Sequence, residues 1–254
     1  MYVDSALLLI FMKKKTIHFK GNATGYFYYI GYGLLLRNHY NLKAIQFSGC
    51  SSGAIIATLL ALNLDLKKAA TAIVQVQPKK THPFALLGNW KKRLKEYLEY
   101  LLPVERAYET VTNLRIGVEF IHQFRFIYSF TSKQDVIACL LASTHIPFFM
   151  DFRLLGKFRG KYCIDGDFFR GYERMKESNV LYINSEIPVL KSLSPLSEEQ
   201  IIQLIIKGYR DAAANKQLFE YLKKEQRMPY SEEPLKNYLQ AVKGFLVADY
   251  PHKT

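Results

Sequence analysis

The fold class of this chain is decided by residues 44–64, AIQFSGCSSGAIIATLLALNL. Residues 44–48 are typical of a short strand, and residues 54–64 of a helix made of small and aliphatic residues. The turn between them, Gly49-Cys50-Ser51-Ser52-Gly53, has the G-x-S-x-G spacing, in which glycines relieve crowding and the central serine stands at the apex. These residues predict a strand that turns sharply into a helix.

Residues 16–36 follow the same plan. A strand is expected over 16–19, a turn-rich loop over 20–25, and a buried helix in the apolar and aromatic residues that continue to Leu36. Two consecutive strand-turn-helix units favour a parallel sheet with helices packed on it, which is the α/β class. The turns after the two strands can then meet at the carboxyl edge of the sheet.

Further elements are expected to complete this core. The patterns predict mostly helix over 65–113, two strands within 114–130, a helix over 135–143, a hairpin over 153–163 and a strand over 180–184. Ser197 and Gln200 form a capping box that begins a helix running towards Lys223, and a last helix is expected over 235–247. We expect a single domain over 1–254, with a core of about 16–190 on which the C-terminal helices 191–254 pack.

The composition is that of a globular chain. It has 254 residues, of which 49% are hydrophobic and 22% are charged, so disordered, low-complexity and collagen-like classes are excluded. Its cysteines, Cys50, Cys139 and Cys163, are far apart and form no C-x-x-C pair, which argues against a disulfide framework or a zinc site. A reducing compartment fits this cysteine usage, and we expect the cytoplasm.

The strong positive charge favours an anionic partner. Lys and Arg number 35 against 22 Asp and Glu, which gives a net charge of +13. Nucleic acid is disfavoured, because the basic residues are dispersed and accompany no base-reading motif. Peripheral contact with an anionic membrane surface is favoured, since basic residues adjoin apolar ones in two places: Lys13-Lys14-Lys15 after residues 6–12, and Lys91, Lys92, Arg93 and Lys95 after Trp90.

Neither of these segments is expected to cross a bilayer. The apolar run at 6–12 has seven residues where a span needs about 20, and it follows Asp4 rather than a basic stretch, so no secretion signal is predicted. This run is expected to be a buried strand or helix, with an interfacial anchor as the alternative. The apolar stripe of an amphipathic helix at 90–102 more commonly faces a core than a bilayer or a substrate entrance.

Ser51 is a candidate nucleophile, with a purely structural turn as the alternative. Its hydroxyl would project near the N-terminus of the next helix, where N–H groups and the helix dipole can stabilise an oxyanion. A serine needs a base to take its proton. A histidine triad is hard to assemble in this chain order, although His145 remains open. The other candidate base is a carboxylate at Asp165-Gly166-Asp167, where a strand runs into a turn that is more often structural.

Several segments together resemble the patatin-like phospholipase family. They are the loop at 20–25, the elbow at 49–53, the pair Asp165-Gly166, and residues 142–149, ASTHIPFF, which are similar to the Ala-Ser-x-x-Ile-Pro stretch before the family's Asp-Gly. The resemblance covers roughly residues 16–185. It implies a three-layer α/β/α fold with a mainly parallel central sheet. It also implies that a Ser-Asp dyad hydrolyses lipid acyl esters through an acyl-enzyme, without a metal or other cofactor.

Carried onto this chain, the resemblance makes Ser51 the nucleophile and Asp165 the general base. Gly49 and Gly53 would shape the nucleophile elbow, and Gly166 would form the turn that holds the base. The implied substrate is the carboxylic ester of a membrane lipid.

The oxyanion-hole N–H groups would come from Gly21, Asn22 and Ala23. Plant-type members carry a run of glycines followed by Arg here, whereas this chain has Asn22 and Ala23 and no Arg, and a Cβ at these positions restricts positive φ. A catalytically silent lipid-binding or scaffold protein that retains the fold is therefore the alternative function. Apolar residues further along are expected in the core, with an acyl pocket as the alternative: Phe148, Phe149 and Met150.

Overall fold

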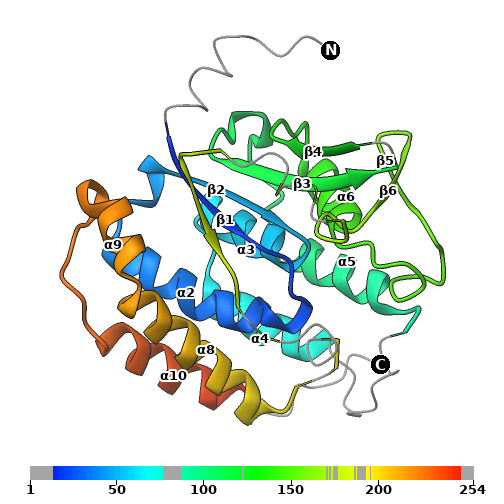
Figure 1. The fold of residues 1–254 in the computed structure, drawn as a ribbon. Helices are drawn as coiled ribbons and strands as arrows, with labels where there is room; N and C mark the ends of the chain where they lie inside the picture. Colours follow the sequence, from blue (N-terminus) through cyan, green and yellow to red (C-terminus); the bar gives the residue numbers. More distant parts are fainter. Residues whose placement is uncertain are drawn as a thin grey trace.

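A single sheet of seven strands runs through the computed structural model, which describes residues 14–76, 87–121, 123–169, 171, 173, 177–185, 187, 193–194 and 196–246 (Figure 1). Its order is β5-β6-β3-β2-β1-β7, with β4 paired to β3. The strands are Lys15–Phe19 (β1), Ile45–Cys50 (β2), Leu114–Phe120 (β3), Gln123–Ile127 (β4), Gly156–Phe158 (β5), Lys161–Ile164 (β6) and Val180–Ile183 (β7). The apolar run predicted at 6–12 lies outside the described residues.

The centre of the sheet is parallel. β1 pairs in parallel with β2 and β7, and β2 pairs in parallel with β3, whereas β4, β5 and β6 run antiparallel to their partners. Phe19 lies opposite Gly49 in the β1–β2 register, so the two strands end together at one edge. The predicted α/β class with a mostly parallel central sheet is confirmed, and the turns that follow β1 and β2 leave the sheet side by side.

Three helices pack directly on the sheet. α3 (Ser52–Ala61) lies against β1, β2 and β3, and α6 (Lys133–Ser143) lies against β3, β5 and β6. α2 (Tyr26–His39) meets β1 through the rings of Tyr29 and Tyr32, which stand edge-on to Phe19. Nearly every residue of α2 is buried, as expected for a helix that is apolar on all sides and packed between two layers.

The long segment between β2 and β3 contains α4 (Leu66–Val76) and α5 (Trp90–Leu101). The stripe of α5 faces the core as predicted, since Leu94, Tyr97, Leu98 and Leu101 are all buried. In the part of the chain that the structure describes, no helix has the length and hydropathy needed to cross a bilayer.

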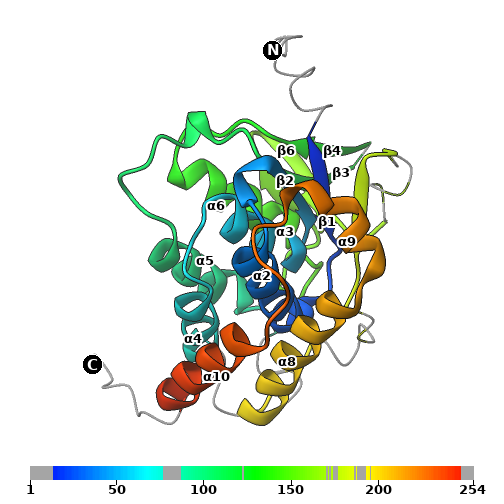
Figure 2. The same cartoon turned by 90° about the vertical axis from the view of Figure 1, so that its left-hand side faces the viewer.

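The C-terminal helices lie on the outer side of α2 (Figures 1 and 2). α8 (Glu198–Ala214) runs along α2, and α10 (Glu233–Leu246) contacts α2, α4 and α8. The capping box predicted at Ser197 and Gln200 is confirmed. The backbones of α2 and α8 touch at two glycines: a Cβ on Gly31 would lie 2.0 Å from the Ile205 carbonyl oxygen, and one on Gly208 would lie 1.9 Å from that of Tyr28.

The helix predicted to run from Ser197 towards Lys223 is wrong, because two helices occupy this span. α8 ends at Ala214, and α9 (Lys216–Leu222) begins after Asn215, whose ψ of 92° interrupts the helical backbone. The Asn215 side chain accepts a hydrogen bond from the Leu218 N–H, with an oxygen to nitrogen distance of 2.9 Å. Asparagine is among the best N-cap residues, so the break doubles as the start of α9.

We expect Gly31→Ala to lower the free energy of unfolding by about 2–3 kcal/mol, because the methyl group forces α8 away from α2. Gly33→Ala, two residues along the same helix, is the control: its Cβ would meet only the ends of the flexible Leu60 and Ile56 side chains, at 3.2 and 3.5 Å. That variant should stay within about 1 kcal/mol of wild type, since alanine also favours helix over glycine. Urea unfolding measures both, and equal losses would contradict the close crossing.

Candidate active site

The elbow between β2 and α3 has no room for side chains on its two glycines. A Cβ on Gly49 would lie 2.3 Å from the Gly53 carbonyl oxygen, and one on Gly53 would lie 2.1 Å from the Phe19 carbonyl oxygen. Ser51, at the apex, has φ 52° and ψ −130°, a conformation that residues with a Cβ rarely adopt. The sharp turn expected from the glycine spacing is therefore present, and Ser51 carries its strain.

Asp165 lies beside Ser51 at the end of β6. Its N–H donates to the His145 carbonyl oxygen at 2.9 Å, and its Oδ1 atom accepts from the Asp167 N–H at 2.8 Å. Its Oδ2 atom is buried and has no hydrogen bond of regular geometry to the described residues. Burial raises the pKa of Asp165 to about 7, while hydrogen bonding to the Ser51 side chain and to the Asp167 N–H opposes the rise. The structure thus brings the two predicted dyad residues together and leaves Oδ2 open to a proton.

Ser143, at the end of α6, links the elbow to the Asp165 turn. Its buried hydroxyl accepts from the Ser51 N–H at 2.9 Å and donates to the Gly117 carbonyl oxygen at 2.6 Å. Its own carbonyl accepts from the Gly166 N–H at 2.9 Å. In the sequence, the one signal for Ser143 is its place in the Ala-Ser-x-x-Ile-Pro stretch, which does not reveal this role. Ser143 is a positioning residue, because it fixes both segments without facing the cavity.

Position 166 also requires a glycine, because the backbone there passes close to β3. A Cβ at this position would lie 2.2 Å from the Gly117 carbonyl oxygen, so the turn after Asp165 is pressed against β3. Gly117 therefore contacts both Ser143 and Gly166.

The loop after β1 lies against the elbow. A Cβ on Gly21 would lie 2.8 Å from the Cβ atoms of both Ser51 and Asp167. The Asn22 N–H donates to Ser52 Oγ at 3.0 Å, and Ala23 adopts a left-handed φ of 33°. The three predicted oxyanion-hole residues are therefore next to Ser51 and Ser52. The Asn22 N–H is already used in its hydrogen bond to Ser52 Oγ.

The Asn22 side chain points away from Ser51. Its Nδ2 atom donates to Ser185 Oγ at 2.6 Å and to the Ile187 carbonyl oxygen at 2.8 Å. These bonds tie the loop to the segment after β7. A residue with a side chain at a glycine-type position thus serves to anchor the loop.

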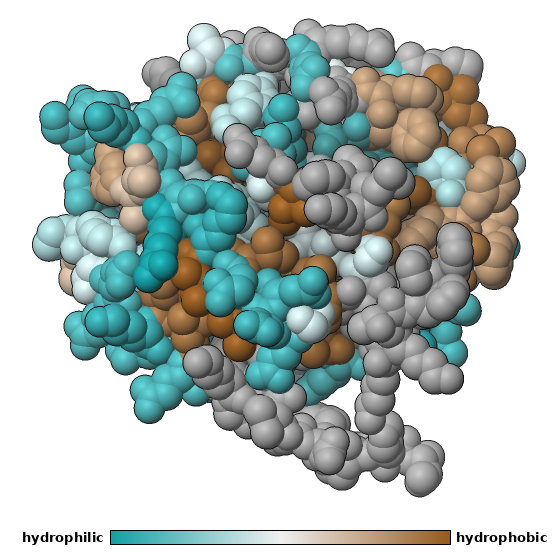
Figure 3. Space-filling view, turned by 60° about the horizontal axis from the view of Figure 1, so that its bottom comes forward, coloured by the Kyte–Doolittle hydropathy of each residue, from teal (hydrophilic) through white to brown (hydrophobic). Residues whose placement is uncertain are grey.

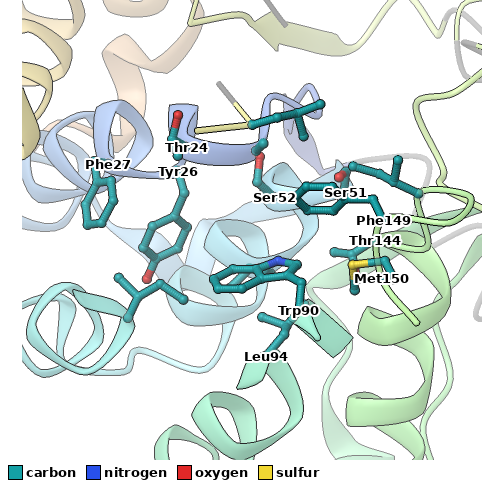
Figure 4. Close-up of a pocket in the computed structure, with 15 residues that line it drawn as sticks. Thr24, Tyr26, Phe27, Ser51, Ser52, Trp90, Leu94, Thr144, Phe149 and Met150 are labelled. Atoms are coloured by element: carbon teal, nitrogen blue, oxygen red, sulfur yellow. The ribbon is translucent and has the colours of Figure 1, made fainter. Parts of the chain in front are cut away.

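An apolar cavity opens at Ser51 (Figure 4) and encloses about 650 Å³, counting the part that opens to solvent. Figure 4 shows Trp90 and Leu94 of α5 facing Ser51 and Ser52 across this space. Most of the remaining lining is apolar, and it includes Tyr26, Phe27, Ile55, Ile73, Ile146, Phe149 and Met150.

The expectation that residues 148–150 belong to the core is only partly right. Met150 is buried, Phe149 packs against the core, and both line the cavity. Phe148 is exposed, so the core prediction is wrong for this residue. Its φ of 62° turns the chain so that the ring faces solvent.

The described histidines have partners other than Ser51. The His145 ring packs on the segment before β5, where it hydrogen-bonds the backbone at Arg153 and Leu154, and burial lowers its pKa. His18 is fully buried, with Nδ1 2.9 Å from Ser48 Oγ. Of the other histidines that follow Ser51 in sequence, His82, His122 and His252 lie outside the described residues. Within the described ranges, no three His, Cys, Asp or Glu side chains gather to hold a metal ion.

The sequence matches the model of one protein family. The family model for patatin-like phospholipases matches residues 19–171, more than half of the chain, so the chain belongs to the patatin-like phospholipase family. No curated protein matches the sequence. Among solved structures, the chain is similar to VipD from Legionella pneumophila, with 12% identity, 85% of this chain and 68% of that chain covered, and a TM-score of 0.45.

We expect Asp165→Asn to stabilise the fold at alkaline pH. The folded-state pKa of about 7 lies above the value of about 3.9 in an unfolded chain, so the contribution of Asp165 to stability is fully present below pH 4 and is lost as pH rises through 7. Asparagine cannot ionise. The stability of the variant relative to wild type should therefore grow between pH 5 and pH 8.5 by on the order of 2 kcal/mol in urea unfolding.

Asp151→Asn is the control with the opposite sign. Asp151 has a lowered pKa because it accepts hydrogen bonds from Lys91, with Nζ 2.6 Å from Oδ2, so its replacement should lose stability above pH 4. An Asp165→Asn effect that is independent of pH would contradict the raised pKa.

Proposed function

We propose that this protein is a lipid acyl hydrolase of the phospholipase or lysophospholipase type, with Ser51 and Asp165 as its catalytic dyad. Members of the patatin-like phospholipase family are usually serine hydrolases. One observation carries the finer proposal: a strained Ser51 stands at an apolar cavity, beside a buried carboxyl whose pKa burial raises to about 7. A nucleophile with its base at such a cavity suits the acyl ester of a lipid.

In the proposed reaction, Asp165 takes the hydroxyl proton of Ser51 while Ser51 Oγ bonds to the ester carbonyl carbon. The carbonyl oxygen becomes an oxyanion, which N–H groups of the loop at 21–23 and the N-terminus of α3 stabilise. Asp165 then gives the proton to the departing alcohol, and the acyl group stays on Ser51. A water molecule, deprotonated by Asp165, then attacks the acyl carbon of this acyl-enzyme. The bond to Ser51 Oγ breaks, Asp165 returns the proton to Ser51 Oγ, and the fatty acid is released.

The availability of N–H donors for the oxyanion distinguishes a hydrolase from a catalytically silent protein of the same fold. The Asn22 N–H is bound to Ser52 Oγ, so it can serve as an oxyanion donor only if this hydrogen bond opens, and otherwise the other N–H groups of the loop and of the α3 N-terminus must suffice. A silent lipid-binding or scaffold protein would keep the cavity but leave the donors engaged. A fluorophosphonate probe distinguishes the two, because it labels only an activated serine.

The proposed substrate lies in a membrane. A net charge of +13 favours peripheral adsorption to anionic lipid, where each basic residue near the surface contributes about 1 kcal/mol at physiological salt. Salt should weaken this adsorption, because the Debye length is about 8 Å at physiological ionic strength.

Ser51→Ala should lower ester hydrolysis by about a thousandfold or more, because it removes the attacking oxygen. The fold should be retained, since alanine at the same backbone angles loses only a hydroxyl. Asp165→Asn should be nearly as damaging, and the double variant little worse than either single one, because nucleophile and base act as a unit. Hydrolysis of a phospholipid and of a water-soluble short-chain ester measures all three. Ser51→Ala activity within tenfold of wild type would return Ser51 to a structural role.

The rate should depend on the ionisation of Asp165. Only the carboxylate accepts a proton, and its pKa is raised to about 7, so kcat/KM should fall roughly tenfold per pH unit below pH 7. His145→Ala should leave this profile in place, because the His145 ring faces the segment before β5. A rate that stays constant down to pH 5 would show that Asp165 is not the base. Loss of the pH dependence in His145→Ala would point to His145 as the base instead.

A further inference from the structure

Exposed apolar residues flank two cavity-lining residues, Phe149 and Met150, in the loop between α6 and β5. Phe148, Phe152 and Leu154 are 55%, 64% and 56% exposed, and Leu87 beside them is 36% exposed. We name these four residues the apolar rim. The stripe of α5, the other apolar surface that the sequence offered to a bilayer in this region, is buried in the core.

Two residues of the apolar rim adopt a backbone conformation unfavourable to them. Phe148 has φ 62° and Phe152 has φ 58°. Bulky residues rarely occupy this left-handed region, whereas glycine and asparagine occupy it readily. Both rings are more than half exposed, so core packing does not compensate for the strain. Folding alone would favour glycine or asparagine at these positions, which points to a role for the rings outside the core.

The apolar rim is held firmly by backbone hydrogen bonds. The Phe148 N–H donates to the Arg153 carbonyl oxygen at 2.9 Å, which closes the loop on itself. The N–H groups of Gly88 and Lys91 donate to the carbonyl oxygens of Phe149 and Met150 at 2.7 and 3.1 Å. These bonds join the loop to the start of α5. The rings are therefore presented by a fixed scaffold.

The loop that carries the apolar rim also builds the cavity. Phe149 and Met150, between Phe148 and Phe152 in sequence, line the same space as Ser51. Figure 3 shows apolar surface gathered along the right-hand edge of the molecule, the side on which β5 and β6 lie in Figure 1. Most of the apolar rim and part of the cavity wall therefore belong to one loop.

The charges around the apolar rim favour an anionic partner. Asp151, the one acidic residue of the segment 147–158, is neutralised by Lys91, with Nζ 2.6 Å from Oδ2. Arg153 and Lys157, in the same segment, are exposed. An apolar centre with basic side chains around it matches a bilayer, whose acyl chains take up rings and whose anionic head groups attract cations.

We infer that the apolar rim is the surface through which this protein docks on an anionic lipid bilayer. Docking in this way brings the cavity wall of Phe149 and Met150 to the lipid. The inference rests on the proposed function for its purpose, but the binding can be measured without turnover.

The test compares Phe148→Asn, Phe152→Asn and their combination with Val104→Asn. Val104 is 78% exposed and lies in the segment after α5. In this segment, Arg106 donates a hydrogen bond to the Leu62 carbonyl oxygen. Leu62 follows the C-terminus of α3, whereas Ser51 precedes its N-terminus, so Val104 lies away from the site. Sedimentation with vesicles of phosphatidylcholine and phosphatidylglycerol measures binding, with pure phosphatidylcholine as the comparison. The double variant should bind the anionic vesicles at least tenfold more weakly than wild type, and Val104→Asn should stay within twofold.

Two further measurements keep docking apart from folding and from chemistry. The melting temperature of the double variant should match or exceed that of wild type, because asparagine relieves the left-handed strain. Hydrolysis of a water-soluble short-chain ester should change less than twofold while phospholipid hydrolysis in vesicles falls with binding. Unchanged vesicle binding by the double variant would overturn the inference. It would also be overturned if the two rings proved to bind another protein and not lipid. Failure of the proposed function would instead appear as wild-type vesicle binding without hydrolysis of either ester.

Discussion

The candidate site depends on the close approach of the elbow to the end of β1. The Gly53 backbone stands so near the Phe19 carbonyl that a Cβ would lie 2.1 Å from its oxygen. Because Phe19 is paired with Gly49, the elbow and the loop after β1 leave the sheet together, and α3 packs across both strands. This crowding leaves Ser51 a left-handed conformation at the apex and places Gly21 against its Cβ atom. The strain at Ser51 is thus imposed by the packing of α3 on the sheet.

The third segment of the site is joined to this elbow by Ser143. Its hydroxyl reaches the Ser51 N–H, 92 residues away in sequence, while its carbonyl holds the Gly166 N–H. A strained residue persists only where its surroundings determine it from several sides. Ser143, the Gly117 carbonyl and α3 together supply that constraint. The distance between nucleophile and base is therefore set by buried hydrogen bonds rather than by the flexible ends of side chains.

The glycine spacing and the apolar periodicity were enough to predict the parallel core and the elbow. Such close approaches exclude a Cβ, so they leave a direct trace in the sequence. Hydrogen bonds between distant residues leave none, which is why the roles of Ser143 and of the Asn22 side chain were missed. Phe148 was assigned to the core because a phenylalanine is usually buried, but its left-handed backbone turns the ring outward. The sequence pattern predicts one continuous helix through Asn215, because its capping role depends on the turn that it makes with Leu218.

Exclusion of water connects the proposed chemistry to the proposed substrate. As the proposed base, Asp165 suits neutral pH because burial disfavours its charge, and the same burial costs the fold stability once pH has risen through 7. The adjoining cavity is mainly apolar, so it suits a fatty acyl group better than a polar substrate, which would lose hydrogen bonds to water on entering it. The aromatic loop at 148–154 extends this apolar character to the surface, where exposed rings would gain by entering lipid. A site of the proposed kind, with a buried base, an apolar cavity and an apolar rim, would favour lipid at each stage, from docking to proton transfer.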